Sequence, residues 1–330
     1  MGVAPCKLCE TDQSEIVSIE DRKGEALETR VCLGCGQVFN NPVPSDVELT
    51  QFYSEDYRKE YKGAARPRGR QIIRNFRRTA SHLKRFSDVL EGRNRVLDVG
   101  AGSGEFLFAL TQMGKITHGF EPNQDYSAYC REDLGLDVQT NQIDGLKPAS
   151  TGYDPIHLSH VLEHLNAPVR HLNAPVRHLE KLASWLVPQG VLYVEVPNVF
   201  EYSARKSNGK MFHYGHIFNY SPWTLGAAAC RAGLTELDAT KDRCSDTTGC
   251  FFVRTDDMLD PTACLNAENV KLVSGAIGDH CSGQVESQRD GAIVRLARKL
   301  TVRVNESIAA RRESTPQDIG RSVLSSANLI

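Results

Sequence analysis

The amino-acid sequence predicts a doubly wound α/β domain preceded by a small cysteine-rich module. Three observations support this prediction. Seven short apolar runs between residues 94 and 254 alternate mostly with helical segments, a glycine-rich turn follows the first run, and four of the ten cysteines form two tight pairs near the N-terminus. Strands that alternate with helices are typical of a mainly parallel sheet covered on both faces, and the last two runs, which lack an intervening helix, predict an antiparallel finish.

The overall composition is that of a globular protein and excludes collagen-like, coiled-coil and wholly disordered chains. Of 330 residues, 40% are hydrophobic and 24% charged, and Lys+Arg 39 against Asp+Glu 41 leaves a net charge of −2. Such a balance provides no overall field that would recruit nucleic acid or an anionic membrane. No apolar run approaches a membrane span, and the first residues lack the pattern of a secretory leader. We therefore expect a cytoplasmic protein with no membrane partner.

The chain divides into four predicted segments. They are a metal-binding ribbon at 1–45, a helical connector at 46–92, an α/β domain at 93–256, and a helical extension at 257–330 whose tail is expected to be disordered. The connector carries an aromatic stripe of Tyr53, Tyr57 and Tyr61. It also carries eleven Lys/Arg against one acid between residues 58 and 85, which indicates either a solvated helix face or a patch for an anionic substrate or RNA.

Two further segments of the chain contain predicted helices. Residues 291–312 predict an amphipathic helix. The heptad HLNAPVR at 164–170 is repeated without change at 171–177. The second copy places Pro175 where it would break or kink a helix begun earlier, so we expect the helix either to start at Pro175 or to kink there. We assign the duplication no chemical role.

The cysteine pairs predict a metal site. Cys6 and Cys9, and likewise Cys32 and Cys35, are separated by two residues. Two such turns complete a tetrahedral shell of four thiolates with no open position, so we expect structural zinc, with rubredoxin-like iron as the alternative. The pairs, flanked by short β-like runs, predict an autonomous module.

The glycine-rich turn predicts a nucleoside-containing ligand. It reads Asp98-Val-Gly100-Ala-Gly102-Ser-Gly104 after an apolar strand, and its glycines let a ligand approach the backbone at a helix start. Asp98 could oppose an ammonium group, and Glu121, about 20 residues after the turn, has the position of an acid that binds ribose hydroxyls. S-adenosylmethionine fits these features better than NAD.

With these motifs, residues 94–254 resemble a class I S-adenosylmethionine-dependent methyltransferase, which has a Rossmann-like seven-stranded sheet. The motif at 98–104, Glu121, Tyr153-Asp154 with the segment Ser159 to His164, the segment 185–198 and the His-rich loop 212–221 all match that family. The four-cysteine ribbon followed by a Tyr-rich helix resembles a subgroup that acts in bacterial sugar, polysaccharide and natural-product pathways.

The resemblance implies which residues form the sites. A cofactor pocket would contain Asp98, Gly100, Ala101, Gly102, Gly104, Phe106, Glu121, Pro122, Gln142, Ile143, Ser159 and His160, with Asp144 as an alternative polar contact to adenine. On the acceptor side, His216 is the first choice for a general base and His213 the second. The subgroup's sugar C-methyltransferases carry a Glu-His pair where this chain has Gly215-His216, which favours O- or N-methylation. Glu163 and His164 are expected to position neighbouring loops.

These inferences predict transfer of a methyl group from S-adenosylmethionine to a small polar acceptor, a sugar or nucleotide-linked sugar. One alternative is an RNA methyltransferase that uses the ribbon and basic segment, although nucleic acid is not the expected partner. Another is a non-catalytic scaffold that retains the fold. The sequence leaves the acceptor, the methylated atom and the oligomeric state open.

Overall fold

The structure is a computed structural model that describes residues 5–44, 48, 66–141, 143–145, 147, 151–165, 174–201, 211–237, 247–281, 301–302, 306–307, 313 and 315–330. Tyr53, Tyr57, Tyr61, Gln142, the side chain of Asp144 and nearly all of the helix expected at 291–312 lie outside these residues. The chain forms two compact units. The ribbon unit comprises Met1–Phe52 with Leu158–Ser287, and the glycine-turn unit comprises Tyr53–His157 with Gln288–Ile330.

Seven strands form the predicted mixed sheet, in the order β10-β11-β8-β7-β4-β5-β6. They are β4 (Arg95–Val99), β5 (Ile116–Phe120), β6 (Val138–Gln139), β7 (Ile156–Ser159), β8 (Val191–Pro197), β10 (Leu234–Glu236) and β11 (Thr247–Arg254). Pairing is parallel from β4 to β5 and from β5 to β6, whereas β11 runs antiparallel to both β8 and β10. The expected α/β class and its antiparallel finish are therefore confirmed.

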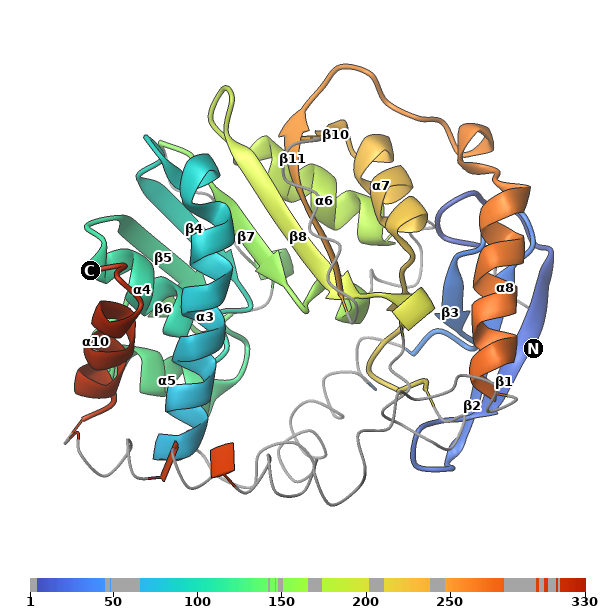
Figure 1. The fold of residues 1–330 in the computed structure, drawn as a ribbon. Coiled ribbons are helices and arrows are strands. Elements are labelled where there is room, and N and C mark those ends of the chain that lie inside the picture. Colours follow the sequence, from blue (N-terminus) through green and yellow to red (C-terminus); the bar gives the residue numbers. More distant parts are fainter. Residues whose placement is uncertain are drawn as a thin grey trace. The chain divides into compact units, whose positions relative to one another are not determined.

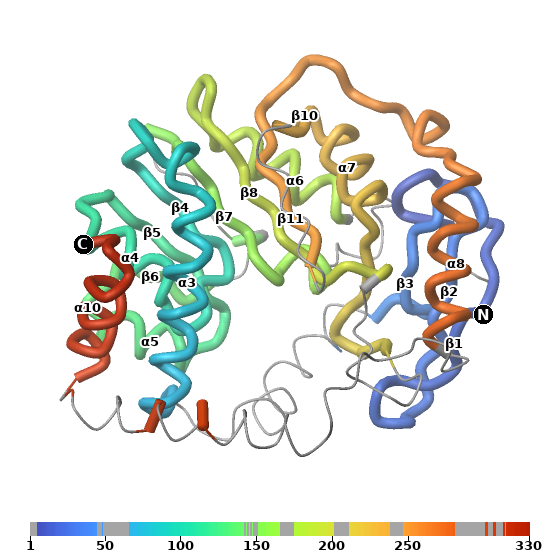
Figure 2. The backbone as a smooth tube through the Cα atoms, viewed as in Figure 1, coloured from blue at the N-terminus to red at the C-terminus, as the bar shows by residue number. Residues whose placement is uncertain are grey.

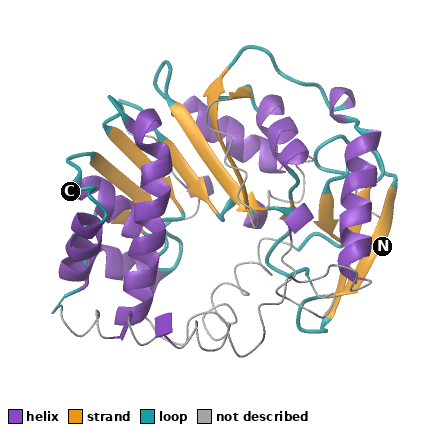
Figure 3. Cartoon of the chain, viewed as in Figure 1, coloured by secondary structure: helices purple, strands orange, loops and turns teal. Residues whose placement is uncertain are grey.

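Helices cover the strands of the glycine-turn unit (Figures 1 and 3). They are α3 (Gly69–Leu90), α4 (Glu105–Gln112), α5 (Gln124–Glu132) and α10 (Pro316–Ser326), with the short η2 (Ile143–Gly145) after β6. Most of the apolar side chains of α3 are buried, and Phe76 among them packs edge-on against Phe108 of α4 at 5.4 Å. A Cβ at Gly320 of α10 would lie 2.6 Å from Phe76 and 2.8 Å from Phe108. Glycine therefore permits α10 to approach these rings closely.

The cysteine-rich module shares its sheet with a later part of the chain. Strands β1 (Ser14–Glu20), β2 (Ala26–Cys32) and β3 (Val38–Asn40) form an antiparallel sheet that β9 (Phe218–Asn219) completes. Figure 2 shows the chain running on from β11 to α8 (Ala267–Cys281), which lies beside this sheet. One buried apolar cluster joins the three segments: Leu27, Val31, Val38, Val199, Met211, Phe212, Val273 and Ile277. The expectation of an autonomous module is wrong, because much of its core comes from residues 199–277.

The ribbon unit also contains further helical elements. They are η3 (Leu162–His164), α6 (Ala174–Ser184), η4 (Val199–Glu201), α7 (Pro222–Arg231) and η6 (Thr262–Cys264). Helix α6 begins one residue before Pro175, so this proline stands in its first turn, where it is tolerated. Residues 166–173, which hold the rest of the duplication, lie outside the described residues. Within the part of the chain that the structure describes, no helix has the length and apolarity needed to cross a membrane.

Candidate functional site

The glycine turn lies between β4 and α4. Gly100, Gly102 and Gly104 have φ of 78°, 55° and 79°, a region in which side chains with a Cβ are strained. The backbone N–H groups of Gly100 and Ala101 donate to Phe120 O at 2.8 and 2.9 Å, which anchors the turn to β5. A Cβ at Gly104 would lie 2.7 Å from the sulfur of Cys130, whereas a Cβ at Gly102 would meet nothing within 4 Å. Gly104 therefore serves packing, and Gly102 leaves open space beside the backbone.

Glu121 follows β5 and bends back to the glycine turn. Its side chain is buried, Oε2 accepts the Gly102 N–H at 2.7 Å, and Oε1 accepts the Asn123 N–H at 2.8 Å. Asn123 also caps α5 by accepting from Tyr126 N at 3.0 Å. The carboxylate is thus fixed by backbone donors on both sides.

Asp98 is 3% exposed and pairs with a residue that the sequence analysis missed. Its Oδ1 lies 2.7 Å from Nδ1 of His157 on β7. The His157 ring stacks on Phe106 at 3.9 Å between centroids, which fixes its orientation. A histidine inside the apolar run Ile156–Ser159 was the available signal. The geometry makes His157 the residue that orients the Asp98 carboxylate.

Other buried polar groups surround the start of α4. Glu105 accepts from Ser103 Oγ at 2.8 Å and from Asn75 Nδ2 at 2.9 Å. Cys130 donates to Gly102 O at 3.4 Å, and burial, reinforced by the Glu105 carboxylate, raises the pKa of the Cys130 thiol. Among the other expected pocket residues, Ile143 is buried in η2, Ala101 and Phe106 are half-buried, and Pro122 is exposed.

Within the ribbon unit, Ser159 and His160 contact Glu195 of β8. Ser159 Oγ donates to Glu195 Oε1 at 3.0 Å, and Tyr193 OH donates to Oε2 at 3.0 Å. His160 has φ of 55°, and its N–H donates to Glu195 O at 2.8 Å. A lone acid in the apolar run of β8 was the only signal for Glu195, and the sequence analysis missed it.

A histidine cluster, defined as His160, Glu163, His164, His213 and His216, extends from this point. The rings of His164 and His216 lie 4.7 Å apart, and those of His213 and His216 lie 5.2 Å apart. His164 Nδ1 lies 2.6 Å from Gly215 O, and the Gly215 N–H donates to His213 Nδ1 at 3.1 Å. Loss of hydration, followed by the field of His164, lowers the pKa of His216 well below its ordinary value.

Glu163 of η3 lies at the centre of this cluster. It is 1% exposed, and its Oε1 is 3.5 Å from His160 Nδ1 and 3.7 Å from His164 Nε2. The hydroxyl of Tyr220 is fully buried, and burial followed by the Glu163 charge raises its pKa well above the ordinary value. The side chains of Glu163 and Tyr220 are therefore both shielded from solvent.

Residues near the end of the ribbon hold the loop that carries His213 and His216. Asn40 of β3 is fully buried, and its Nδ2 lies 3.2 Å from each of His213 O, Tyr214 O and His216 O. Gln37 Nε2 donates to Asn219 O at 2.8 Å. The histidine loop thus depends on side chains about 175 residues earlier in the chain.

The four cysteines, which we call the cysteine cluster, meet as predicted. The Sγ atoms of Cys6 and Cys35 lie 3.7 Å apart, those of Cys9 and Cys32 lie 3.4 Å apart, and all four lie within 4.8 Å of one another. A tetrahedron with Zn–S of about 2.3 Å has S···S edges of about 3.8 Å. Leu8 N and Gly34 N donate to Cys6 Sγ and Cys32 Sγ at 3.4 and 3.3 Å, as suits thiolates. The residues present fit a tetrahedral metal ion.

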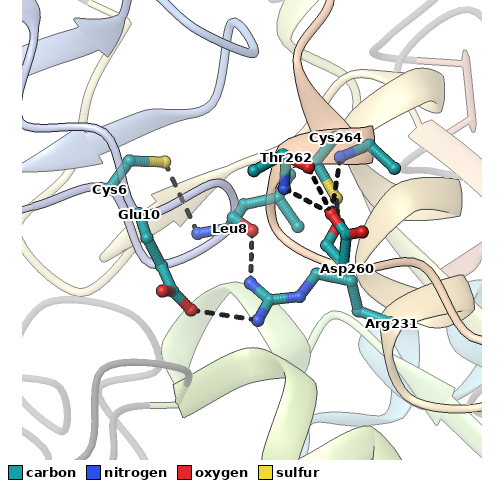
Figure 4. Close-up of polar contacts among 8 residues, drawn as sticks. Cys6, Leu8, Glu10, Arg231, Asp260, Thr262 and Cys264 are labelled. Atoms are coloured by element: carbon teal, nitrogen blue, oxygen red, sulfur yellow. Dashed lines mark hydrogen bonds and ion pairs between the residues drawn. The ribbon is translucent and has the colours of Figure 1, made fainter.

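The turn that carries Cys6 and Cys9 is bound to α7. Arg231 donates to Leu8 O and, at 3.1 Å, to Glu10 Oε1 (Figure 4). Figure 4 also shows Asp260, whose Oδ1 accepts from Thr262 N at 2.8 Å just before η6. The second turn is held by α8, because Asn269 Nδ2 donates to Cys35 O at 2.7 Å. Both turns are therefore fixed by elements outside the ribbon itself.

Comparison with solved structures identifies methyltransferases of low similarity. A SAM-dependent methyltransferase from Archaeoglobus fulgidus shares 21% identity over 52% of this chain and 91% of its own, with a TM-score of 0.40. The 1,6-didemethyltoxoflavin-N1-methyltransferase of Burkholderia thailandensis shares 16% identity over 67% of this chain and 96% of its own, with a TM-score of 0.48. The N-methyltransferase NodS of Bradyrhizobium japonicum shares 15% identity over 55% of this chain and 98% of its own, with a TM-score of 0.41. Values this low carry no conclusion about the acceptor.

The sequence itself assigns the family. A comparison with curated proteins gave no match. A family model described as a methyltransferase domain matches residues 71–238, half of the chain, a range that includes the glycine turn, Glu121 and the histidine cluster. The chain therefore belongs to this methyltransferase-domain family.

Proposed function

We propose that the protein uses S-adenosylmethionine to methylate a small polar acceptor, a sugar or nucleotide-linked sugar, in the cytoplasm. The observation that carries the cofactor assignment is the pair of buried carboxylates, Asp98 and Glu121, beside a turn that leaves open space at Gly102. The acceptor class rests on the resemblance of the ribbon and connector to methyltransferases of sugar and natural-product pathways.

In this proposal the expected pocket residues contact different parts of the cofactor. Asp98, oriented by His157, would oppose the ammonium group of the methionine end. Glu121, held beside the glycine turn by the Gly102 N–H, would accept hydrogen bonds from the ribose hydroxyls. The other contacts would come from Gly100, Ala101, Gly102, Gly104, Phe106, Pro122, Gln142, Ile143, Ser159 and His160.

The chemistry then requires little more of the protein than alignment and removal of a proton. The bound cofactor supplies a methyl group that its sulfonium makes electrophilic. The protein has to orient the acceptor and accept the proton that its hydroxyl or amine loses. We assign that role to His216 and, second, to His213, because their loop is held in place by Asn40. Gly215 supplies no carboxylate beside His216, which favours O- or N-methylation over C-methylation.

The cysteine cluster is proposed to hold structural zinc. Four cysteines use every position of a tetrahedral ion, so such an ion cannot bind or activate a substrate. Its contribution would be to fix the two cysteine-bearing turns and, through β3, the histidine loop.

Calorimetric titration with S-adenosylhomocysteine tests the cofactor site without requiring an acceptor. We expect one site per chain, with binding at least about tenfold weaker in Asp98→Ala and Glu121→Gln, because each variant removes a charged hydrogen-bonding partner. Asp88→Asn, on the exposed side of α3, is the control and should bind like the native chain. Absence of binding by folded, zinc-replete protein would contradict the proposal and favour a non-catalytic scaffold.

The acceptor class requires a separate assay. Transfer of labelled methyl from S-adenosylmethionine to a panel of nucleotide sugars is expected, with RNA as the competing acceptor. Label found in RNA and in none of the sugars would contradict the small-acceptor assignment while leaving the cofactor site intact.

A further inference from the structure

We propose that Glu163, His164 and His216 form a second metal site, which binds a divalent first-row transition-metal ion. Each residue offers one ligand atom, and the three atoms lie within 4.8 Å of one another. The site is distinct from the cysteine cluster in its residues and its ligand types. Its binding of metal does not depend on the proposed function, although its use in methyl transfer does.

The orientation of His164 suits a metal ligand. Its Nδ1 lies 2.6 Å from the carbonyl oxygen of Gly215, which can only accept, so Nδ1 carries the hydrogen. Its other nitrogen, Nε2, lies 3.7 Å from Glu163 Oε1. An ion with metal–ligand distances of about 2.1 Å can bind both of these atoms. A backbone carbonyl that orients one ring nitrogen is also the usual support for a metal-binding histidine.

The burial of Glu163 also favours a bound cation. Neither carboxylate oxygen has a hydrogen-bond partner among the residues that the structure describes, although the side chain is 1% exposed. Glu195 is nearly as buried, at 4%, yet it accepts hydrogen bonds from Ser159 and Tyr193. A buried carboxylate is costly unless it is paired, hydrogen-bonded or bound to a metal. The groups around Glu163 are the histidines of the cluster and the Tyr220 hydroxyl, which has no hydrogen-bond partner in the described structure either.

The ligand set indicates the class of ion. Two imidazole nitrogens and one carboxylate oxygen suit Mn²⁺, Fe²⁺, Co²⁺ or Zn²⁺, whereas Ca²⁺ and Mg²⁺ prefer oxygen alone. Three protein ligands leave at least one coordination position open, in contrast to the closed cysteine cluster. If the proposed function holds, an oxygen of the acceptor can occupy that position and be made more acidic there.

This site changes the role of His216. A nitrogen that coordinates a metal cannot accept a proton, so the metal-bound enzyme would activate its acceptor through the ion. His216 would serve as the base only in a protein that binds no metal at this position. Metal binding therefore decides between the two roles.

The test is a titration of zinc-replete, full-length protein with Mn²⁺, followed by electron paramagnetic resonance, and with Co²⁺, followed by visible absorption. We expect one ion of either metal per chain. Glu163→Gln and His164→Gln should weaken binding at least about tenfold, because each removes a ligand. His178→Gln removes a buried histidine of α6 outside the cluster and should bind like the native chain. The titration distinguishes the two sites in two ways. The cysteine cluster is already occupied by zinc, and Mn²⁺ prefers nitrogen and oxygen ligands to thiolates.

Thermal unfolding and calorimetry with S-adenosylhomocysteine accompany each titration. The proposal is overturned if folded native protein binds neither ion, or if Glu163→Gln binds as well as His178→Gln. Metal binding without S-adenosylhomocysteine binding would contradict the proposed function and leave the metal site standing. Binding of S-adenosylhomocysteine without binding of either metal would support the proposed function and contradict the metal site.

Discussion

The glycine-turn unit and the ribbon unit stabilise their buried polar groups in different ways. In the glycine-turn unit, Glu121 accepts from two backbone N–H groups, both within 19 residues of it along the chain. In the ribbon unit, the histidine loop is held by Asn40, which lies 173 residues before His213. A site built from local turns forms wherever its own segment folds. A site built from distant segments requires the whole unit, so the two should respond differently to damage.

Removal of the metal from the cysteine cluster should have the largest effect. A structural zinc ion contributes about 10 kcal/mol or more in isolated zinc-finger peptides, so chelation or Cys35→Ser should unfold the ribbon sheet and release the histidine loop. Methyl transfer should fall below detection, while S-adenosylhomocysteine still binds to the glycine-turn unit. Zinc content, calorimetry and hydrogen exchange measure the three effects. Equal loss of hydrogen-exchange protection in the segments of both units would contradict the expected difference between them.

Gly104→Ala should have the next largest effect, confined to the glycine-turn unit. The new methyl group would lie 2.7 Å from Cys130 Sγ and 2.9 Å from Leu136 Cδ1, at a φ of 79°. Backbone strain and overpacking together should lower the free energy of unfolding by about 3 kcal/mol. Gly114→Ala is the matched control, because its φ is 80° and nothing lies within 4 Å. Urea unfolding that finds the two variants equally stable would show that packing against Cys130 is unimportant.

Asn40→Ala should lower the free energy of unfolding less than Gly104→Ala does. Its main effect should be to loosen the loop that carries His213 and His216. It removes the donor shared by three buried carbonyls, which should cost about 2 kcal/mol. Thr29→Val is the control, since it removes only the hydroxyl that donates to Asn40 Oδ1 at 3.2 Å. Hydrogen exchange should show faster exchange at residues 213–219 in Asn40→Ala alone. Unchanged exchange there would mean that the ribbon does not hold the loop.

Gly102→Ala should be the mildest change to stability, about 1 kcal/mol, because only its positive φ opposes a methyl group. The methyl group would nevertheless occupy the space beside the turn, so S-adenosylhomocysteine should bind about tenfold more weakly. Calorimetry beside urea unfolding separates the two effects. A variant that loses stability but keeps its affinity would place the cofactor elsewhere.

The same contrast explains what the sequence could predict. The strand at Ile156–Ser159, the glycine turn and the cysteine pairs are local patterns, and the structure forms them where the patterns lie. Strand β11 begins at Thr247, three residues before the apolar run that starts at Cys250, because its pairing with β8 extends to Pro197. Long-range pairing of this kind overrides the polar residues at its start.

The missed residues follow from the same physics. Glu195 and His157 are single polar residues inside apolar strands, and only the fold shows that Tyr193 and Asp98 partner them. The two residues of β9 are too few for any pattern, so its pairing with β3 was not predictable. That pairing, together with the shared apolar core, is why the expected autonomy of the ribbon failed.

The shared core of the ribbon has a consequence for how the protein is made. Val31 and Val38 leave the ribosome early, but their packing partners Val273 and Ile277 are about 235 residues further along. At about 5–20 residues per second, translation takes roughly 10–50 seconds to deliver them. During that interval the nascent cysteine pairs are present without the helix that covers them, so the order of metal loading and chain completion becomes part of the protein's biosynthesis.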